Sequence, residues 1–342
     1  MERNRSKSVN NAHLLLAHFK TVLQTQHLVE RGDSLVIGVS GGRDSVCLLH
    51  LFASIQAGWR LTITVAHLNH RLRGEASAED ERFVVSLSQH LGIPCVVERK
   101  EFTRLDTKGG SLELAARRER YQFFKRVCET AGATKVAVAH TKDDDVETIL
   151  FRILRGNNGK GLQGIPYRRK LGSVEVIRPL KEVGRGEIQP FLVERGLSWR
   201  EDSSNADLHY TRNRIRKELL PYLKERFNPN VKEALLRLGR ERSELEAYLS
   251  SEIDRLARRY LHRQDSGLFL EGQSVLKLHP FLQKQLFWKC LEELGLGGGA
   301  FRSTHAQMAL SLLRRGKGSV DLPESVRLKA DREGLHVTKG NG

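Results

Sequence analysis

Short, nearly continuous apolar runs alternate along the first half of the chain with segments whose apolar residues recur at helical spacing. A run such as SLVIGVS, residues 34–40, is typical of a strand that is covered on both faces. Similar runs follow at residues 61–67, 94–98, 135–140 and 174–180. Helical spacing is found at residues 14–28, before the first strand, and then at 44–57, from 77 onward, at 111–131 and at 143–154. Strands that alternate with helices predict an α/β fold with a doubly wound, mainly parallel sheet of five strands.

This alternation stops beyond about residue 228. Residues 231–261 have the pattern of a long, charged amphipathic helix, and residues 268–322 mix short helices with a glycine break. Hairpin-like alternation follows at residues 320–337. We therefore expect two domains, residues 1–227 and a smaller α+β domain at residues 228–342.

Composition limits the classes of protein that this pattern allows. The chain has 342 residues, 39% of them hydrophobic, which is enough for a sizeable core in each of two domains. No apolar run approaches the roughly 18 residues of a membrane helix, and no secretory signal is expected. The four cysteines are far apart and form no CxxC pair, which argues against zinc, iron–sulfur and disulfide frameworks and fits a reducing cytoplasm. The net charge of +16 favours RNA or DNA as a partner over a merely solvated basic surface.

A polar hexapeptide, Ser-Gly-Gly-Arg-Asp-Ser, follows the first predicted strand at residues 40–45. Open α/β sheets bind ligands outside the carboxyl ends of their strands. Glycines let the backbone approach a phosphate closely, and the free N–H groups of a helix start favour an anion. The alternative is an ordinary strand-to-helix turn with a serine cap, and the Walker pattern with its lysine is not met.

The hexapeptide resembles the PP-loop of the ATP-pyrophosphatases, which cleave ATP between its α and β phosphates. The resemblance implies that the loop holds pyrophosphate and that Asp44 helps to hold Mg²⁺. It assigns ATP binding to Ser40, Gly41, Gly42, Arg43, Asp44 and Ser45.

The second predicted strand leads into the segment AHLNHRLR, residues 66–73. Its two histidines, His67 and His70, lack a third ligand at metal spacing, so the residues alone favour solvated or hydrogen-bonded loop histidines. The segment resembles the signature of the tRNA(Ile)-lysidine synthetase branch of the PP-loop family, and on that basis His67 joins the predicted ATP-binding residues.

Charged residues share one face of the predicted helix at 111–131. Arg117, Arg120 and Tyr121 occupy neighbouring positions, and an ion-paired surface with Glu113 is the alternative. The family carries a similar string, which implies that Arg117 lies against phosphate or the activated base. Arg117 is thus a predicted catalytic residue, together with Asp44 and Asp144.

Three consecutive aspartates, Asp143 to Asp145, follow the fourth predicted strand, which is more than helix capping requires. Asp144 and Glu147 present two carboxylates on one side of a helix, and such a pair suits Mg²⁺ or an ammonium group. We predict that the pair binds lysine, with Mg²⁺ as the alternative. The family usually has an amide where this chain has Asp145, so the role of Asp145 stays open.

Basic residues gather in the second half of the first domain. Residues 152–185 contain nine Lys and Arg against Glu175 and Glu182, which suggests a polyanionic substrate. The segments at 199–205 and 212–216 resemble a substrate-contacting stretch of the family, with a capped basic helix as the alternative. The predicted tRNA contacts are Arg120, Arg155, Lys160, Arg212 and Arg216.

These six motifs occur in the family's order over residues 33–220. Together they imply a ligase that adenylates C2 of the wobble cytidine of a CAU-anticodon isoleucine tRNA and then joins L-lysine to it. The expected partners are tRNA, ATP with Mg²⁺ and free L-lysine, with no membrane, and a homodimer stays open. Residues 1–227 would then be the PP-loop catalytic domain and residues 228–342 a tRNA-recognition domain.

Three other functions are compatible with parts of the pattern. A tRNA-thiolating PP-loop enzyme also adenylates a base, but such enzymes commonly use cysteine pairs that this chain lacks. A synthetase of a small molecule such as NAD or GMP fits less well with the basic surplus and the second domain. A non-catalytic RNA-binding module fits less well with the intact hexapeptide at residues 40–45.

Overall fold

The computed structural model describes residues 2–71, 74–101, 112–156, 161–201, 208, 211–265, 267–296 and 300–340, without the side chains of residues 2–10 and 113. The chain divides into two compact units, Met1–Arg242 and Ser243–Gly342, and each is described by itself. Unit 1 denotes the first of them and unit 2 the second.

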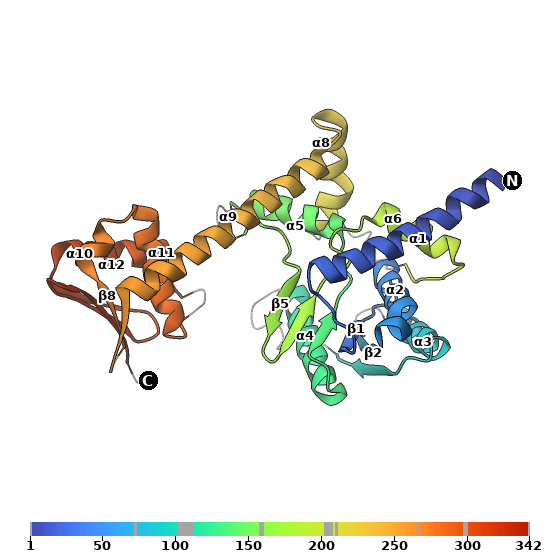
Figure 1. Ribbon diagram of the computed structural model, residues 1–342, viewed down its shortest axis with the longest axis horizontal. Helices are drawn as coiled ribbons and strands as arrows, with labels where there is room; N and C mark the ends of the chain where they lie inside the picture. The colour runs from blue at the N-terminus through green and yellow to red at the C-terminus, as the bar shows by residue number, and fades with distance from the viewer. Residues whose placement is uncertain are drawn as a thin grey trace. The chain divides into compact units, whose positions relative to one another are not determined.

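A six-stranded sheet with the strand order β3-β2-β1-β4-β6-β5 forms the centre of unit 1 (Figure 1). Its strands are β1 (Ser34–Gly38), β2 (Thr62–Asn69), β3 (Cys95–Arg99), β4 (Lys135–Ala137), β5 (Arg168–Leu171) and β6 (Val174–Ile177). The five predicted strands are all present and pair in parallel. The predicted fold class is confirmed.

The sixth strand, β5, was not predicted, and it pairs antiparallel with β6 at the edge of the sheet. Three of its four residues, Arg168, Arg169 and Lys170, are exposed. An edge strand with charged side chains is protected against pairing with other chains, but it buries no alternating apolar face. The hydrophobic pattern therefore contains no signal for this strand.

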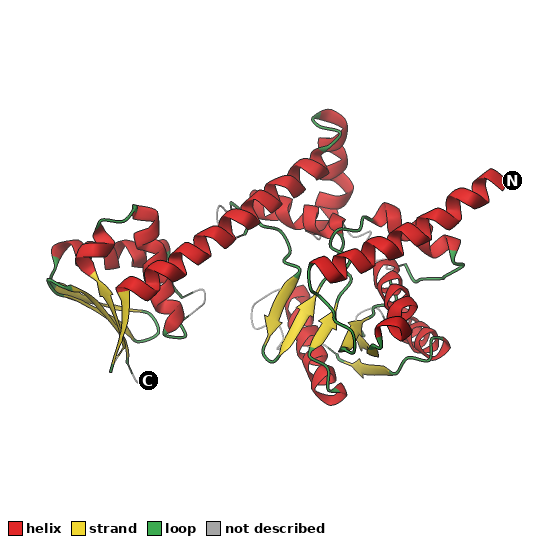
Figure 2. Cartoon of the chain, viewed as in Figure 1, coloured by secondary structure: helices red, strands yellow, loops and turns green. Residues whose placement is uncertain are grey.

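Helices cover both faces of the sheet (Figure 2). One face packs against α1 (Glu2–Thr25), α2 (Arg43–Trp59), α3 (Glu75–His90) and α6 (Arg185–Glu194), and the other against α4 (Leu112–Ala131). Within β1, Leu35 and Ile37 belong to the first core and Val36 to the second. Because successive side chains of a strand point to opposite faces, this two-sided burial explains the continuous apolar run.

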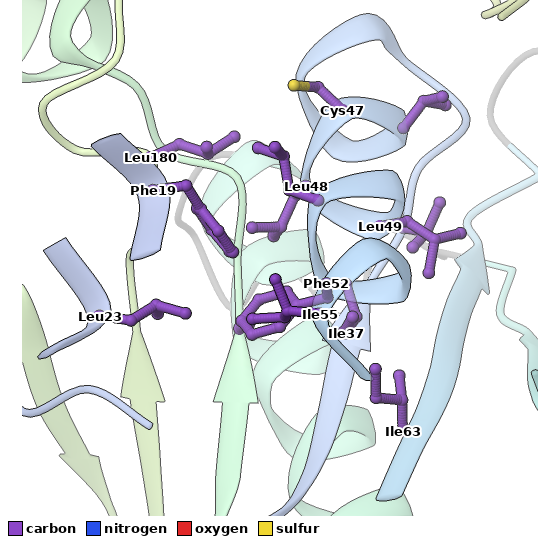
Figure 3. Packing of buried hydrophobic residues seen from close by; sticks show 14 of the residues in the cluster. Phe19, Leu23, Ile37, Cys47, Leu48, Leu49, Phe52, Ile55, Ile63 and Leu180 are labelled. Carbon is purple, nitrogen blue, oxygen red and sulfur yellow. The ribbon is translucent and has the colours of Figure 1, made fainter. Parts of the chain in front are cut away.

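Aromatic and branched side chains interlock in the larger core (Figure 3). The rings of Phe19 from α1 and Phe52 from α2 meet edge to face with their centroids 5.1 Å apart. Both side chains are fully buried, beside Leu23 and Ile37. The first helix is therefore an integral part of unit 1.

The end of unit 1 packs against α5 (Lys142–Leu154). This part comprises α7 (Thr211–Arg214), a π-helical turn (Ile215–Leu219), α8 (Leu220–Arg226) and the first part of α9 (Val231–Tyr260). Val146, Leu150, Ile215 and Leu236 form one small core. The division between the units thus falls inside α9, 15 residues after the predicted boundary at 227/228, because the first turns of α9 pack on α5. A continuous amphipathic helix gives no sequence signal for such a division.

Unit 2 is a five-stranded antiparallel sheet with helices packed on it, which agrees with the predicted α+β class. The strand order is β7-β8-β11-β10-β9. The elements are β7 (Leu261–Gln264), β8 (Gly267–Glu271), α10 (Gly272–Leu276), α11 (Pro280–Glu293), α12 (Ser303–Arg315), β9 (Gly318–Leu322), β10 (Val326–Ala330) and β11 (Gly334–Lys339). The alternation at 320–337 corresponds to β9, β10 and β11, while β7 and β8 were not predicted.

No helix in the described part of the chain is both long enough and apolar enough to cross a membrane.

Replacement of Phe19 by alanine tests whether α1 belongs to the core. The change removes a fully buried ring, and we expect it to lower the free energy of unfolding by about 3–5 kcal/mol. Leu14→Ala on the same helix is the control, because Leu14 is 60% exposed and should change stability by less than about 0.5 kcal/mol. Urea unfolding followed by circular dichroism measures both. Equal stability of the two variants would contradict the packing of α1.

Candidate active site

The hexapeptide at residues 40–45 forms a tight turn between β1 and α2. Gly41 has φ +87°, a conformation that side chains disfavour, and Gly42 is the extended residue before the helix. The Ser45 hydroxyl donates to the Gly42 carbonyl (2.8 Å) and accepts from the Ser40 N–H (3.1 Å). Arg200 also donates its backbone N–H to the Gly41 carbonyl (2.9 Å). The loop is thus shaped in advance, with the free N–H groups of the helix start available to an anion.

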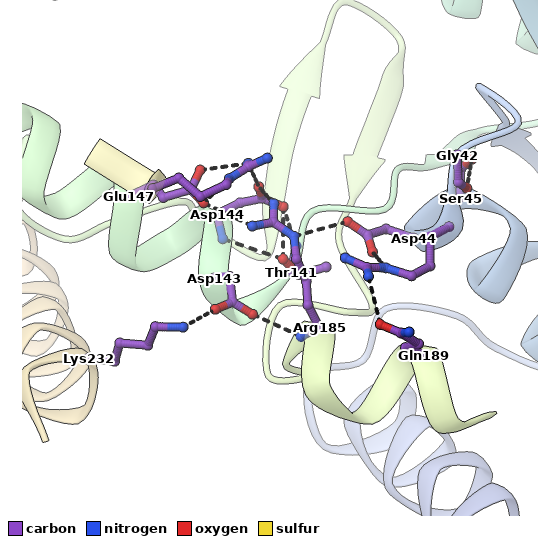
Figure 4. A network of polar contacts seen from close by, with 12 residues as sticks. Gly42, Asp44, Ser45, Thr141, Asp143, Asp144, Glu147, Arg185, Gln189 and Lys232 are labelled. Atoms are coloured by element: carbon purple, nitrogen blue, oxygen red, sulfur yellow. Dashed lines mark hydrogen bonds and ion pairs between the residues drawn. The ribbon is translucent and has the colours of Figure 1, made fainter. Parts of the chain in front are cut away.

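The acidic cluster begins α5 at the end of β4, the neighbour of β1 in the sheet. Thr141 caps the helix. Its backbone N–H (2.8 Å) and its hydroxyl (2.9 Å) both donate hydrogen bonds to Asp144 Oδ2. Because the carboxyl ends of parallel strands share one edge, this helix start lies beside the hexapeptide. The predicted proximity of the two motifs is therefore present in the structure (Figure 4).

One arginine, Arg185, joins the two motifs. Its Nη2 lies 2.6 Å from Asp144 Oδ1, its Nη1 2.9 Å from Glu147 Oε1 and its Nε 3.5 Å from Asp44 Oδ2. Burial raises the pKa of Asp44, and the Asp144 carboxylate raises it further, while Arg185 acts in the opposite direction. Burial lowers the pKa of Arg185, but the three carboxylates outweigh it and raise that pKa overall. The guanidinium therefore compensates three acidic groups at once.

Glu147 is held by a second arginine as well. Arg216 Nε lies 2.6 Å from Glu147 Oε1 and its Nη2 2.9 Å from Oε2, while the Glu147 side chain is only 3% exposed. The predicted cation site at Asp144 and Glu147 thus holds two guanidinium groups in this structure. Arg216, which was predicted to contact tRNA, pairs with both carboxylates and is also 30% exposed to solvent.

The other two aspartates of the cluster have separate partners. Asp143 pairs with Lys232 from α9 (2.5 Å) and accepts the backbone N–H of Arg185 (2.8 Å). Asp145 is 3% exposed, pairs with Lys181 (2.9 Å) and accepts the Ile165 N–H (2.5 Å). Asp145 therefore fixes the segment around Ile165 instead of contributing charge beside Asp44.

Histidine and arginine side chains border the same edge of the sheet. His67 is 4% exposed, and its Nδ1 donates to the Val39 carbonyl (2.8 Å), while its Nε2 has no hydrogen-bond partner among the described residues. Burial lowers the pKa of His67, so the ring is neutral at pH 7 and this Nε2 is a hydrogen-bond acceptor. Burial also lowers the pKa of His140 to about 3, and Arg117 and Arg120 add to the effect.

Arginines from several elements surround Tyr121 of α4. The guanidinium carbons of Arg117, Arg120 and Arg169 lie 5.2, 5.9 and 4.3 Å from the centroid of its ring. Burial raises the pKa of Tyr121, but Arg117 and the other arginines outweigh it and lower that pKa overall. This face of α4 is therefore strongly cationic beside the acidic cluster of α5.

The remaining predicted contacts are dispersed. Arg155 is exposed, with its guanidinium 4.3 Å from the ring centroid of Phe151, and Arg212 is half-buried in α7. Lys160 and residues 202–205 lie outside the described residues. The described residues contain no group of three or more His, Cys, Asp or Glu side chains placed to hold a metal. Mg²⁺ often takes only one or two carboxylates together with substrate phosphates, so Asp44 remains compatible with it.

Arg185, which contacts three carboxylates of the site, was not among the site residues predicted from the sequence. One signal was available, because Arg185 is the first residue of α6 and the positive end of a helix dipole disfavours a cation. Such a position indicates that other groups hold the side chain in place.

The chain matches the family model described as the PP-loop domain over residues 14–223, so the fold and the loop define a PP-loop protein. It is 34% identical to a tRNA(Ile)-lysidine synthase of Dehalococcoides mccartyi, over 94% of this chain and 69% of that one. It is 39% identical to the synthase of Geobacter sulfurreducens, over 86% and 63%, and 34% identical to that of Thermosynechococcus vestitus, over 92% and 88%. The chain therefore belongs to the tRNA(Ile)-lysidine synthase family.

A solved structure shares the fold at lower sequence identity. The U34-tRNA thiolase NcsA from Methanococcus maripaludis superimposes with a TM-score of 0.54 at 17% identity, over 66% of this chain and 77% of that one. This likeness supports the α/β architecture of unit 1.

Removal of the Asp145 carboxylate tests its structural role. Asp145→Ala leaves the half-buried Lys181 and the Ile165 N–H without their acceptor, and we expect the free energy of unfolding to fall by about 3–5 kcal/mol. Asp145→Asn keeps an acceptor and should cost less. The control is Glu75→Ala, which breaks an exposed ion pair with Arg82 and should cost less than about 1 kcal/mol. If urea unfolding shows Asp145→Ala to be as stable as the control, Asp145 does not anchor this segment.

Proposed function

We propose that this protein joins L-lysine to C2 of the wobble cytidine of a CAU-anticodon isoleucine tRNA. ATP first adenylates the C2 oxygen and releases pyrophosphate, and the lysine ε-amine then displaces AMP to give lysidine. The observation that carries the proposal is that one guanidinium, that of Arg185, contacts both the loop at residues 40–45, through Asp44, and the carboxylate pair of Asp144 and Glu147. Membership of the tRNA(Ile)-lysidine synthase family supports the same reaction.

In the first step, the loop at residues 40–45 binds the phosphates of ATP through its backbone N–H groups and Arg43. His67 supplies an acceptor for a donor of the nucleotide, since its Nε2 is buried and has no partner among the described residues. Arg117 stabilises the negative charge that develops on the transferred phosphate or the base oxygen. Asp44 would hold Mg²⁺, which would offset phosphate charge when bound.

In the second step, Asp144 and Glu147 orient the lysine. The amine must lose a proton before it attacks, and a carboxylate can accept that proton as well as hold the ammonium form. Asp144 is the better placed of the two, because its side chain is 22% exposed against 3% for Glu147. Glu147 then acts by holding Arg185 and Arg216.

Charge is distributed unequally between the two units, which bears on tRNA binding. Residues 243–342 contain 15 Lys and Arg against 12 Asp and Glu, so they carry only +3 of the net +16. We assign phosphate contacts mainly to unit 1, at Arg155, Lys160, Arg212 and the Arg120 face of α4. Unit 2 then selects and orients the tRNA.

A tRNA-thiolating reaction is the main alternative, and the positions of the cysteines speak against it. Cys47 and Cys128 lie in different cores of unit 1, on opposite faces of the sheet, and Cys290 lies in the core of unit 2. Burial raises the pKa of Cys128 and that of Cys290 to about 12, so neither thiol is a ready nucleophile. The free cysteines are consistent with a cytoplasmic location.

Asp44→Ala tests the assignment of the loop. We expect pyrophosphate release with tRNA and ATP to fall at least about 10²-fold, because the variant lacks the carboxylate that would hold Mg²⁺ at the phosphates. Asp33→Ala is a matched control, since Asp33 lies before the other end of β1 with 23% exposure against 24% for Asp44. Circular dichroism checks that both variants fold. Near-normal release from a folded Asp44→Ala protein would remove the assignment.

Arg155→Ala tests the proposed phosphate contacts of unit 1. Loss of one phosphate contact should weaken tRNA binding and reduce the slope of log K against log salt by about 0.9. The control is Arg31→Ala, an exposed arginine before the opposite end of the sheet strands. Filter-binding titrations across a salt series measure both slopes. The same slope for wild type and Arg155→Ala would exclude Arg155 from the interface.

A further inference from the structure

Arg185 binds the same carboxylates that the proposed function assigns to the two small-molecule substrates. Its guanidinium reaches Asp44 of the ATP loop at 3.5 Å, and Asp144 and Glu147 of the lysine pair at 2.6 and 2.9 Å. Its side chain is 18% exposed. Each substrate therefore meets Arg185 when it enters the site.

The position of Arg185 depends on these carboxylates. As the first residue of α6 it lies at the positive end of a helix dipole, which disfavours a cation. Its backbone N–H is fixed by Asp143 (2.8 Å), so the base of the side chain is anchored and the long side chain can turn about it. The guanidinium can exchange partners without movement of the helix.

The two substrates change its surroundings in opposite ways. The phosphates of ATP bring negative charge to the loop at residues 40–45 and attract the guanidinium. The side-chain ammonium group of lysine requires the carboxylate of Asp144 and repels the guanidinium. Movement of Arg185 toward the phosphates would therefore make Asp144 available to the amine.

We propose that Arg185 couples the binding of ATP to the binding of lysine, so that lysine binds more tightly once the nucleotide occupies the loop. This inference rests on the proposed function. Coupling of this kind is reciprocal, since each ligand must change the affinity for the other by the same factor. Such coupling fixes the order of the reaction, because Asp144 becomes available to the lysine amine only when ATP is bound.

Calorimetric titration of the full chain with L-lysine, without tRNA, tests the coupling. The titrations are made with and without α,β-methylene ATP and Mg²⁺, because this analogue cannot be cleaved between its α and β phosphates. For the wild type we expect the analogue to tighten lysine binding at least fivefold, within the usual range of such couplings. Arg185→Gln should bind lysine more tightly than the wild type in the absence of the analogue, and the analogue should change its affinity less than about twofold.

Two further variants keep the experiment decisive. Arg185→Lys retains the charge but cannot span several carboxylates, so we expect it to fold and to lose most of the coupling. Arg195→Gln, an exposed arginine at the other end of α6, should keep the wild-type coupling. Binding of the analogue itself by each variant confirms an intact loop.

The outcomes separate the two proposals. If the wild type shows coupling and both Arg185 variants retain it, Arg185 is not the coupling residue and the proposed function stands. If the wild type binds lysine equally well with and without the analogue, the coupling does not exist. If lysine binds to no protein under either condition, the lysine site of the proposed function fails, and this inference fails with it.

Discussion

The compensation of carboxylates at the start of α5 is the constraint on which unit 1 depends. A buried charge without a partner costs several kcal/mol, so each acid there requires a cation. The partners come from different segments, since Asp143 pairs with Lys232, Asp144 and Glu147 with Arg185 and Asp145 with Lys181. One helical turn thereby attaches α6, α9 and the connection after β6 to the edge of the sheet. The fold and the site share these interactions, so a change in one affects the other.

The architecture of unit 1 could be predicted because its strands are buried on both faces. Runs such as residues 34–40 have no polar alternation to obscure them, and glycines or acidic residues mark where they end. β5 escaped prediction for the opposite reason, because Arg168, Arg169 and Lys170 bury almost nothing. The division inside α9 could not be predicted either, since one continuous helix contributes Leu236 to the small core with α5 and Leu256 to the core of unit 2.

In the site, the arrangement of neighbouring strands could be predicted from the sequence, but contacts between residues far apart in the sequence could not. The proximity of residues 40–45 to Asp144 followed from adjacent parallel strands, which bring their carboxyl ends together. The cations that neutralise the acids lie 36 to 89 residues away in the sequence, and no local pattern links them. Arg216 was therefore assigned to tRNA, because a basic residue in a basic stretch looks the same whether it faces a phosphate or a carboxylate. The structure shows that Arg216 contacts the Glu147 carboxylate, and its predicted contact with tRNA stays a prediction.

The proposed function assigns different roles in RNA binding to the two units, and the distribution of charge supports that assignment. Counterion release depends on the number of phosphates neutralised, and +13 of the net +16 lies in residues 1–242. That net charge already subtracts the acidic residues, and Arg185, Arg216, Lys181 and Lys232, which face carboxylates, are not available to phosphates. Under the proposed function, exposed residues such as Arg155 supply the salt-dependent share of the affinity. If unit 2 selects the tRNA as proposed, a nearly neutral unit must do so through shape and specific contacts, which salt weakens far less.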